Sequence, residues 1–450
     1  MKSLGSFGIL QKKGMIGEME YCKLQLGCLC IILYIVFNYY KERRQLPEKQ
    51  KFSMFDGILI VNTLYLILDG LTAYYVNYQE RISAALNRVF HFFFLLSLDA
   101  SIFLMFLYML SITGRLPKRK KNLLFVWSPF ILNVIALIVD IGSLEYRVGR
   151  ISNYSMGIPV YTCFVMIAVY ILLSITVFFS RWNYIESHKR ISIFSYLGVL
   201  VIVTTYQMTH PDALISSIGI TIVTLGIYVN QENPVMKKLS YQHSEMVMGY
   251  ATLVENKDDS TGGHIKRTTM YVKLLAEELR DRDIYSDILT KDYMNDLMLA
   301  APMHDIGKIS VPDHILQKPG KLTDEEFDIM KQHAANGGKI IQETFGKSDQ
   351  GMYKEVAYQV ARNHHEKWNG RGYPDGLKGN EIPLGVRIMS IADVFDAVSQ
   401  KRCYRDAMPL DQCFEIIEKG RGTDFEPVLV DVFLDIREKV EEVYRKFNDE

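Results

Sequence analysis

The sequence has no net charge and little cysteine, and these two shortages exclude several classes of protein. Lysine plus arginine and aspartate plus glutamate number 51 each, so the overall charge gives no reason to expect a nucleic-acid polymer as partner. The six cysteines include no pair at CxxC spacing, which argues against a structural zinc site and against a disulfide framework. We therefore expect reduced thiols, as in a protein whose soluble part faces the cytosol.

Long apolar runs are missing from the second half of the chain, and this uneven distribution divides the 450 residues. A chain of this length exceeds one hydrophobic core, so two or more domains are expected. We predict a multi-pass membrane region with a sensory role over residues 1–230, a helical linker over 231–254 and a soluble domain over 255–450. The predicted fold class is all-α, because the second half has little period-two alternation.

About seven segments of the first half are long and apolar enough to cross a bilayer, which takes about 20 residues per helix. The predicted spans are Lys23–Tyr40, Met54–Val76, Val89–Ile112, Leu123–Leu144, Ile158–Ser180, Ile191–Met208 and Ala213–Val229. Lysine and arginine concentrate in the loops after the first, third and fifth spans, which assigns those loops to the cytoplasmic side. This orientation predicts a protein of the cell membrane with a cytoplasmic soluble domain.

Two carboxylates, Asp69 and Asp99, lie well inside apolar runs. A charged side chain at the bilayer centre costs about 2.5–3.5 kcal/mol on insertion scales, so both residues are expected to face the interior of the helix bundle. Two interpretations stay open for them. They form a site for a ligand or a proton, or they form polar contacts between helices.

Several helix ends can be placed from local signals. The Asn233-Pro234 step disfavours helical backbone at Asn233 and predicts a break before a helix over Leu239–Val254. Thr323 and Glu326 have the spacing of a capping box and predict the start of a helix that carries His333. Further helices are predicted over Gly385–Gln400 and from Pro427 onward.

Histidine is concentrated in one stretch of the soluble half, where six of the ten histidines lie between positions 264 and 365. Two doublets stand out, His304-Asp305 and His364-His365, because they place several ligand atoms at one point, as a cluster of divalent metals requires. The candidate metal ligands are His264, His304, Asp305, His333, His364, His365 and Asp393. They suffice for two divalent ions, and nitrogen and oxygen ligands without cysteine favour iron or manganese over structural zinc.

The order of these motifs resembles one family. His304-Asp305-Ile306-Gly307-Lys308, His364-His365-Glu366, Gly372-Tyr373-Pro374 and Asp393-Val394-Phe395-Asp396-Ala397 follow the pattern of the HD-GYP phosphodiesterases, a branch of the HD metal-dependent phosphohydrolases. The resemblance extends over about residues 255–434. It implies a metal-dependent hydrolase that opens cyclic di-GMP to linear pGpG through a hydroxide activated between two metal ions, with further conversion to GMP left open.

The resemblance also implies roles for individual residues. Asp305 is expected to bridge the two metals, and Lys308 to contact a phosphate oxygen or protonate the leaving group. Tyr373 is expected to shape a guanine pocket, and Arg402 with Arg405 to bind phosphate, for which the forked guanidinium is suited.

Two positions depart from the family pattern. Members with a third metal usually carry Glu four residues before the position of His264, where this chain has Ser260, so we expect two metals and pGpG as the main product. The family often has Pro where this chain has Cys403, which predicts a less rigid loop between Arg402 and Arg405.

Three alternatives remain open at the level of sequence. The substrate could be another nucleotide, the domain could be a receptor that binds a cyclic dinucleotide without cleaving it, or the main role could be transport by the membrane half. The absence of an evident inverted repeat disfavours transport. The lipid bilayer and the nucleotide are the expected partners, and a homodimer is left open.

Overall fold

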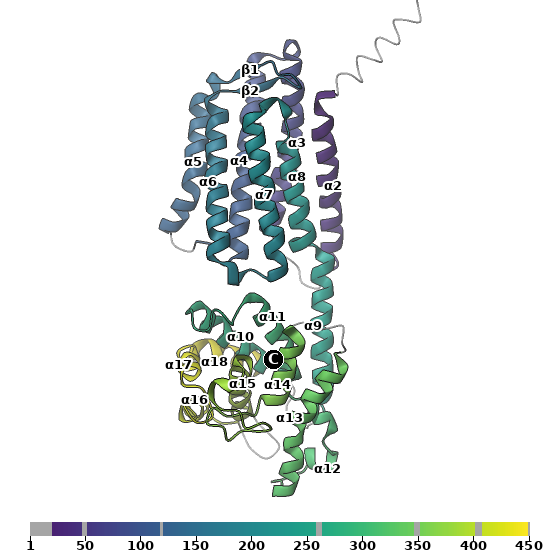
Figure 1. Ribbon diagram of the computed structural model, residues 1–450, viewed down its shortest axis with the longest axis vertical. Helices are drawn as coiled ribbons and strands as arrows, with labels where there is room; N and C mark the ends of the chain where they lie inside the picture. The colour runs from purple at the N-terminus through teal and green to yellow at the C-terminus, as the bar shows by residue number, and fades with distance from the viewer. Residues whose placement is uncertain are drawn as a thin grey trace, which may run out of the picture. The chain divides into compact units, whose positions relative to one another are not determined.

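The computed structural model describes residues 20–46, 52–117, 120–257, 263–345, 352–400 and 407–448, which are mostly helical (Figure 1). They fall into two compact units, Met1–Lys238 and Leu239–Glu450. The boundary lies inside one helix, α9 (Pro234–Glu255). The predicted break is present, because Asn233 has extended backbone with ψ 113°, but the helix begins at Pro234 and not at the predicted Leu239.

The first unit is built from long helices that run side by side (Figure 1). They are α2 (Lys23–Arg43), α3 (Met54–Asn77), α4 (Ala84–Ile112), α5 (Lys120–Asp140), α6 (Ile158–Ser180), α7 (Ser187–Thr209) and α8 (Ser216–Ile227). Short 3-10 turns join several of them, and a π-helical turn, η6 (Tyr228–Glu232), follows α8. Two strands, β1 (Glu145–Arg147) and β2 (Tyr154–Met156), pair as an antiparallel hairpin between α5 and α6. This hairpin is a small exception to the predicted all-α fold.

Six helices of the described residues are long and apolar enough to cross a membrane, namely α2 to α7. The prediction of about seven spans is not confirmed. The seventh predicted segment does form a helix, but α8 has 12 residues and is only about 18 Å long, shorter than the roughly 30 Å of a hydrocarbon core.

Polar side chains connect the helices inside the first unit. Asn62 on α3 donates to Thr224 on α8 over 2.7 Å and accepts from Ser101 on α4 over 2.5 Å. Asp99 on α4 accepts from Asn133 on α5 and from Cys163 on α6. For Asp99 the structure therefore agrees with the interpretation as a polar contact between helices.

The second unit is a helical domain around one hydrophobic core. After α9 it contains α10 (His264–Asp281), α11 (Lys291–Ala300), α12 (Asp313–Leu316), α13 (Asp324–Thr344), α14 (Met352–Asn363), α15 (Leu384–Ser399), α16 (Leu410–Lys419), α17 (Pro427–Asp435) and α18 (Arg437–Asn448). Tyr271, Phe395 and Phe433 are fully buried at its centre. The predicted all-α class is confirmed for this unit, with helices where the sequence placed them.

The start of α13 follows its sequence signal. The Thr323 hydroxyl accepts from the backbone N–H of Glu326, and the Glu326 carboxylate accepts from the backbone N–H of Thr323 over 2.8 Å. Both bonds satisfy backbone groups that the first turn of a helix leaves without partners. The capping box thus fixes where α13 begins and which of its faces carries His333.

Candidate metal centre

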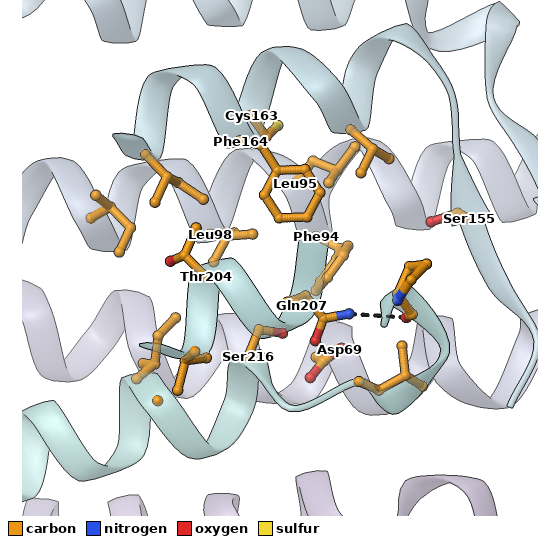
Figure 2. Close-up of a pocket in the computed structure, with 18 of the residues that line it drawn as sticks. Asp69, Phe94, Leu95, Leu98, Ser155, Cys163, Phe164, Thr204, Gln207 and Ser216 are labelled. Carbon is orange, nitrogen blue, oxygen red and sulfur yellow. Dashed lines mark hydrogen bonds between the residues drawn. The ribbon is translucent and has the colours of Figure 1, made fainter. Parts of the chain in front are cut away.

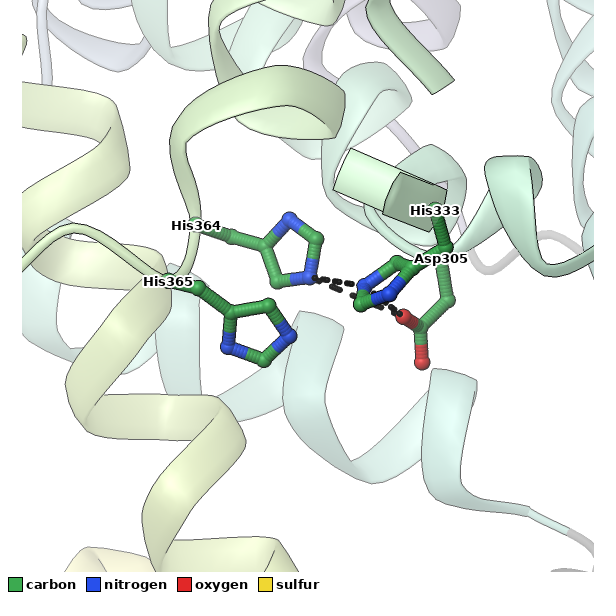
Figure 3. Close-up of side chains that lie close together, drawn as sticks. All are labelled: Asp305, His333, His364 and His365. Carbon is green, nitrogen blue, oxygen red and sulfur yellow. Dashed lines mark hydrogen bonds and ion pairs between the residues drawn. The ribbon is translucent and has the colours of Figure 1, made fainter. Parts of the chain in front are cut away.

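The seven predicted ligands come together as two neighbouring groups of side chains. In one, which we call the His333 group, ligand atoms of Asp305, His333, His364 and His365 all lie within 4.8 Å of one another (Figure 3). In the other, the His264 group, the same holds for His264, His304 and Asp393. Among the residues that the structure describes, every candidate ligand named from the sequence belongs to one of these groups.

Five separate segments supply these side chains. His264 is the first residue of α10, His333 lies midway along α13, and Asp393 lies on α15. The His304-Asp305 doublet lies between two short 3-10 helices, η7 (Ala301–Met303) and η8 (Ile306–Ser310), and His364-His365 follows the last turn of α14. Packing of these elements around one core brings the segments together.

Asp305 lies between the two groups and faces both. Its Oδ1 atom is 3.4 Å from His333 Nε2 and 3.6 Å from His364 Nε2. Its Oδ2 atom is 3.4 Å from His304 Nε2. Each oxygen of one carboxylate is thus directed at a different group, which is the arrangement that a bridging ligand needs.

Hydrogen bonds fix which nitrogen each histidine presents. The Nδ1 atoms of His304, His333 and His364 lie 3.0, 2.7 and 3.1 Å from the backbone carbonyls of Ala301, Met330 and Val360. A carbonyl only accepts, so each Nδ1 carries the proton. His264 Nδ1 lies 2.8 Å from the carboxylate of Asp396 and donates to it in the same way. In the neutral form of each ring, the Nε2 lone pair is therefore directed into the site.

The Nε2 atoms face one another in pairs, and this arrangement fits a bound cation. His264 Nε2 lies 3.3 Å from His304 Nε2, and His333 Nε2 lies 3.3 Å from His364 Nε2. Two lone pairs at this distance repel unless a proton or a metal ion lies near both. Two ligands bound at about 2.1 Å to one ion lie about 3 Å apart when their bonds are perpendicular. The residues present therefore fit a divalent ion in each group.

The ionisation of the site favours metal binding. Burial lowers the pKa of His333 to about 4. Burial also lowers the pKa of His365 well below its usual range, and the neighbouring rings of His364 and His333 lower it further. Burial raises the pKa of the Asp305 carboxyl, but Lys308 and His304 outweigh burial and hold it well below its usual range. Neutral imidazoles and an ionised carboxylate are the forms that bind metals.

His304 differs from the other histidines in its protonation. Burial alone would lower its pKa, but the carboxylates of Asp305 and Asp393 raise it to about 9. A proton therefore occupies Nε2 of His304 when no cation is present. A metal ion bound there would replace this proton, because the same carboxylates attract it.

Two glycines allow backbone segments to approach the site closely. A Cβ atom on Gly307 would lie 1.9 Å from the carbonyl oxygen of His333 and 2.5 Å from the nitrogen of Gly337, so only glycine lets η8 pack on α13. A Cβ atom on Gly372 would lie 2.4 Å from the backbone of Glu366 and Lys367. These glycines hold Asp305 near His333, and Tyr373 near His365.

The remaining predicted residues lie around the two groups. Lys308 Nζ is 2.8 Å from Asp305 Oδ2. The ring of Tyr373 lies on His365, with centroids 4.7 Å apart. Arg402 and Arg405 lie outside the described residues, as do Ser260 and Cys403.

Two supporting carboxylates were not assigned a role from the sequence. Asp396 accepts from His264 and also binds Arg267 through two bonds of 2.7 and 3.0 Å. Glu366 is buried and accepts from the backbone N–H groups of residues 375, 376 and 377 at 2.7–3.1 Å. The signals were present, since Asp396 lies one turn after Asp393 and Glu366 directly follows His365.

Comparison with protein families agrees with this geometry. Residues 251–429 match the family model described as HD domain. This part of the chain is therefore an HD domain, a metal-dependent hydrolase domain, as the ordered series of motifs predicted.

Curated relatives of this part of the chain are named as cyclic dinucleotide phosphodiesterases, which supports the resemblance to the HD-GYP phosphodiesterases. A Vibrio cholerae protein named "Probable cyclic di-GMP phosphodiesterase" is 42% identical over 215 residues, which cover 47% of this chain and 48% of that protein. A Thermotoga maritima cyclic di-GMP phosphodiesterase is 38% identical over 198 residues, covering 44% and 50%. A Vibrio cholerae 3'3'-cGAMP-specific phosphodiesterase is 35% identical over 219 residues, covering 49% and 38%. The chain thus spans half or less of the length of these relatives.

Proposed function

We propose that the protein is a membrane-bound, metal-dependent phosphodiesterase that hydrolyses cyclic di-GMP to pGpG. The observation that carries this proposal is the position of Asp305, whose two oxygens face separate groups of metal-binding side chains. The names of the relatives supply the substrate class. When bound, two divalent ions supply an activated water and offset negative charge on the phosphate.

Side chains of the second unit would bind the two ions. His264, His304 and Asp393 form one half of the site, His333, His364 and His365 form the other, and Asp305 joins them. We assign iron or manganese to these positions, because all ligand atoms are nitrogen or oxygen. Fixed ligands and fixed tautomers mean that little reorganisation is needed when charge develops on the phosphate.

Lys308 and Tyr373 are assigned to the substrate. Lys308 carries its ammonium group beside Asp305, where it would meet a phosphate oxygen or give a proton to the leaving oxygen. Tyr373 offers the face of its ring beside His365, and a guanine base would stack there. Arg402 and Arg405 are assigned to the phosphates from the sequence alone.

The product is assigned as pGpG rather than GMP. This assignment depends on Ser260, which stands where members with a third metal have Glu. A hydroxyl is a weaker ligand for a hard divalent ion than a carboxylate, so the chain offers ligands for two ions.

A second substrate, 3'3'-cGAMP, has one specific observation in its favour. Relatives that are 34–42% identical include proteins named for either cyclic dinucleotide, so identity at this level does not separate the two substrates. The two differ in one base, and the base pocket beside Tyr373 would decide between them.

The test is turnover by the full-length protein in lipid nanodiscs, loaded with Mn²⁺ or Fe²⁺, on cyclic di-GMP, 3'3'-cGAMP and cyclic di-AMP. Metal content is measured on the same samples. We expect cleavage of cyclic di-GMP to pGpG with about two ions per chain. Binding of cyclic di-GMP without any linear product would instead favour a receptor.

We further assign the HD domain to the cytoplasmic side of the membrane. The support is the concentration of lysine and arginine at or after the C-terminal ends of α2, α4 and α6, including Lys41, Arg43 and Arg44 at the end of the first of these. A reporter enzyme that is active only outside the cytoplasm, fused after Glu450, should be inactive. An active fusion would reverse the orientation.

A further inference from the structure

The first unit contains a cavity that the proposed reaction does not use. It lies between α3, α4, α6, α7 and α8, with β2 also contributing to its wall, and its empty space of about 860 Å³ is partly open to the surroundings (Figure 2). Most of the lining is apolar, with Phe94, Leu98 and Phe164 among the side chains that face the cavity in Figure 2.

Among the described residues that line the cavity, Asp69 is the one with a charged side chain. The side chain is 3% exposed and accepts a hydrogen bond from Ser217 on α8. No lysine, arginine or histidine of the described residues forms an ion pair with it. A carboxylate buried without a cation is costly, so the site would gain free energy from a cationic group placed beside Asp69.

Two polar side chains of the cavity wall, Gln207 and Ser216, are already engaged (Figure 2), whereas Gln25 on α2 is buried near Asp69. The amide of Gln207 donates to the carbonyl of Pro211 over 2.9 Å and accepts from the N–H of Ile215 over 2.8 Å. The Ser216 hydroxyl accepts from Tyr65 over 2.9 Å. These bonds hold the wall of the cavity in place and leave Asp69 as the anionic group that a ligand can meet.

Asp99, another buried acid of this unit, is arranged differently. It does not line the cavity, and it accepts hydrogen bonds from Asn133 and Cys163. The sequence left the same two interpretations open for both residues, and the structure distinguishes them. Asp99 connects helices, whereas Asp69 lines a cavity.

We propose that this cavity binds a small amphipathic amine, with the ammonium group on Asp69 and the apolar body among the side chains of α4, α6 and α7. An ammonium–carboxylate bond in a dry site is stronger than a bond between neutral groups, and the apolar wall is complementary to a short alkyl chain. The proposal concerns the first unit alone and does not depend on the proposed phosphodiesterase activity.

The test is calorimetric titration of the full-length protein in lipid nanodiscs with n-hexylamine and with n-hexanol, with empty nanodiscs as blank. The two probes share an alkyl chain and differ in the charge of the head group. In the unaltered protein we expect one saturable site that prefers the amine. Signals no larger than those of empty nanodiscs, or tighter binding of the alcohol, would overturn the proposal.

Variants separate the carboxylate from the cavity itself. Asp69→Asn should weaken binding of the amine roughly tenfold or more and change that of the alcohol little, since only the charged bond is lost. Retained binding of the alcohol also reports that this variant is folded. Thr204→Phe, which fills the cavity from α7, should weaken both probes.

The matched control is Asp140→Asn on α5, an acid that does not line the cavity. It should bind both probes like the unaltered protein. Equal loss of amine binding in the Asp69 and Asp140 variants would refute the pairing. So would loss of both probes in Asp69→Asn, or an unchanged preference for the amine in that variant.

Discussion

His264 Nδ1 donates to Asp396 Oδ2 over 2.8 Å, and the same carboxylate is held by Arg267 through two further bonds. Arg267 is 3% exposed and Asp396 is 1% exposed, so this ion pair is buried. The carboxylate thereby fixes the tautomer of His264, a candidate metal ligand, and also neutralises the buried guanidinium of Arg267. Four predictions follow from this and neighbouring contacts.

Asp396→Asn should lower both stability and metal content. The substitution leaves Arg267 buried without its counter-charge, which costs about 3–5 kcal/mol of unfolding free energy. It also removes the charged acceptor of His264, and such partners typically change metal affinity about 10–100-fold. Thermal unfolding and metal titration measure the two effects.

Asp411→Asn is the control, because Asp411 forms an exposed ion pair with Arg437 and its side chain is 79% exposed. Exposed pairs contribute about 0–1 kcal/mol, so this variant should unfold like the unaltered protein. Similar stability and metal content in both variants would show that Asp396 does not support the site.

Removal of metal should destabilise the second unit. A ligand present at about 100 times its Kd stabilises the folded state by about 2.7 kcal/mol, so a chelator should lower the Tm. His304→Ala should abolish turnover and should reduce the effect of the chelator, because the His264 group then lacks a ligand.

His314→Ala is the matched histidine control, since His314 is exposed and lies outside both groups. It should retain turnover and the full response to the chelator. Turnover by His304→Ala with an unchanged metal content would refute the assignment of the site.

Gly307→Ala should be strongly destabilising, although it adds one methyl group. The new Cβ atom would lie 1.9 Å from the carbonyl oxygen of His333, and backbone atoms cannot move aside cheaply. Overpacking of this kind costs about 1–3 kcal/mol or more, and it would displace Asp305 from the His333 group. The unfolding midpoint and metal content are the measurements.

Gly249→Ala on α9 serves as the comparison, because nothing lies within 4 Å of its Cβ position. Alanine favours helix over glycine by about 1 kcal/mol, so this variant should be equal or more stable. A fully stable Gly307→Ala protein would contradict the close packing of η8 on α13.

Glu366→Gln should raise the KM more than it lowers the kcat. The carboxylate holds three successive backbone N–H groups after Pro374, and a neutral amide binds them less strongly. The turn that carries Tyr373 would then be less firmly held, while the metal ligands stay in place. Steady-state kinetics on cyclic di-GMP separates the two constants.

Glu343→Gln is the control for charge, since Glu343 is an exposed residue of α13 that pairs with Lys339 at 3.9 Å. It should leave both constants unchanged. A fall in kcat alone for Glu366→Gln would assign this residue to the chemistry instead of the turn.

The sequence by itself determined the helices, the two halves of the chain and the seven candidate ligands. Helix ends depend on local chemistry, such as the capping box at Thr323 and the Pro at the start of α17, and this chemistry can be read from neighbouring residues. Long apolar runs likewise mark α2 to α7, because a membrane span is a local property of composition. The doublets at 304–305 and 364–365 marked candidate ligands, because adjacency in the chain is also a local property.

Only the tertiary structure decided how the ligands divide into two groups, that Asp305 faces both, and that Asp396 and Glu366 support them. It also separated Asp69 from Asp99, which look alike in sequence, and shortened the last apolar segment to α8. These features depend on contacts between residues up to about 130 positions apart, such as His264 and Asp396. Such contacts arise from the packing of whole helices, which no local pattern of residues encodes.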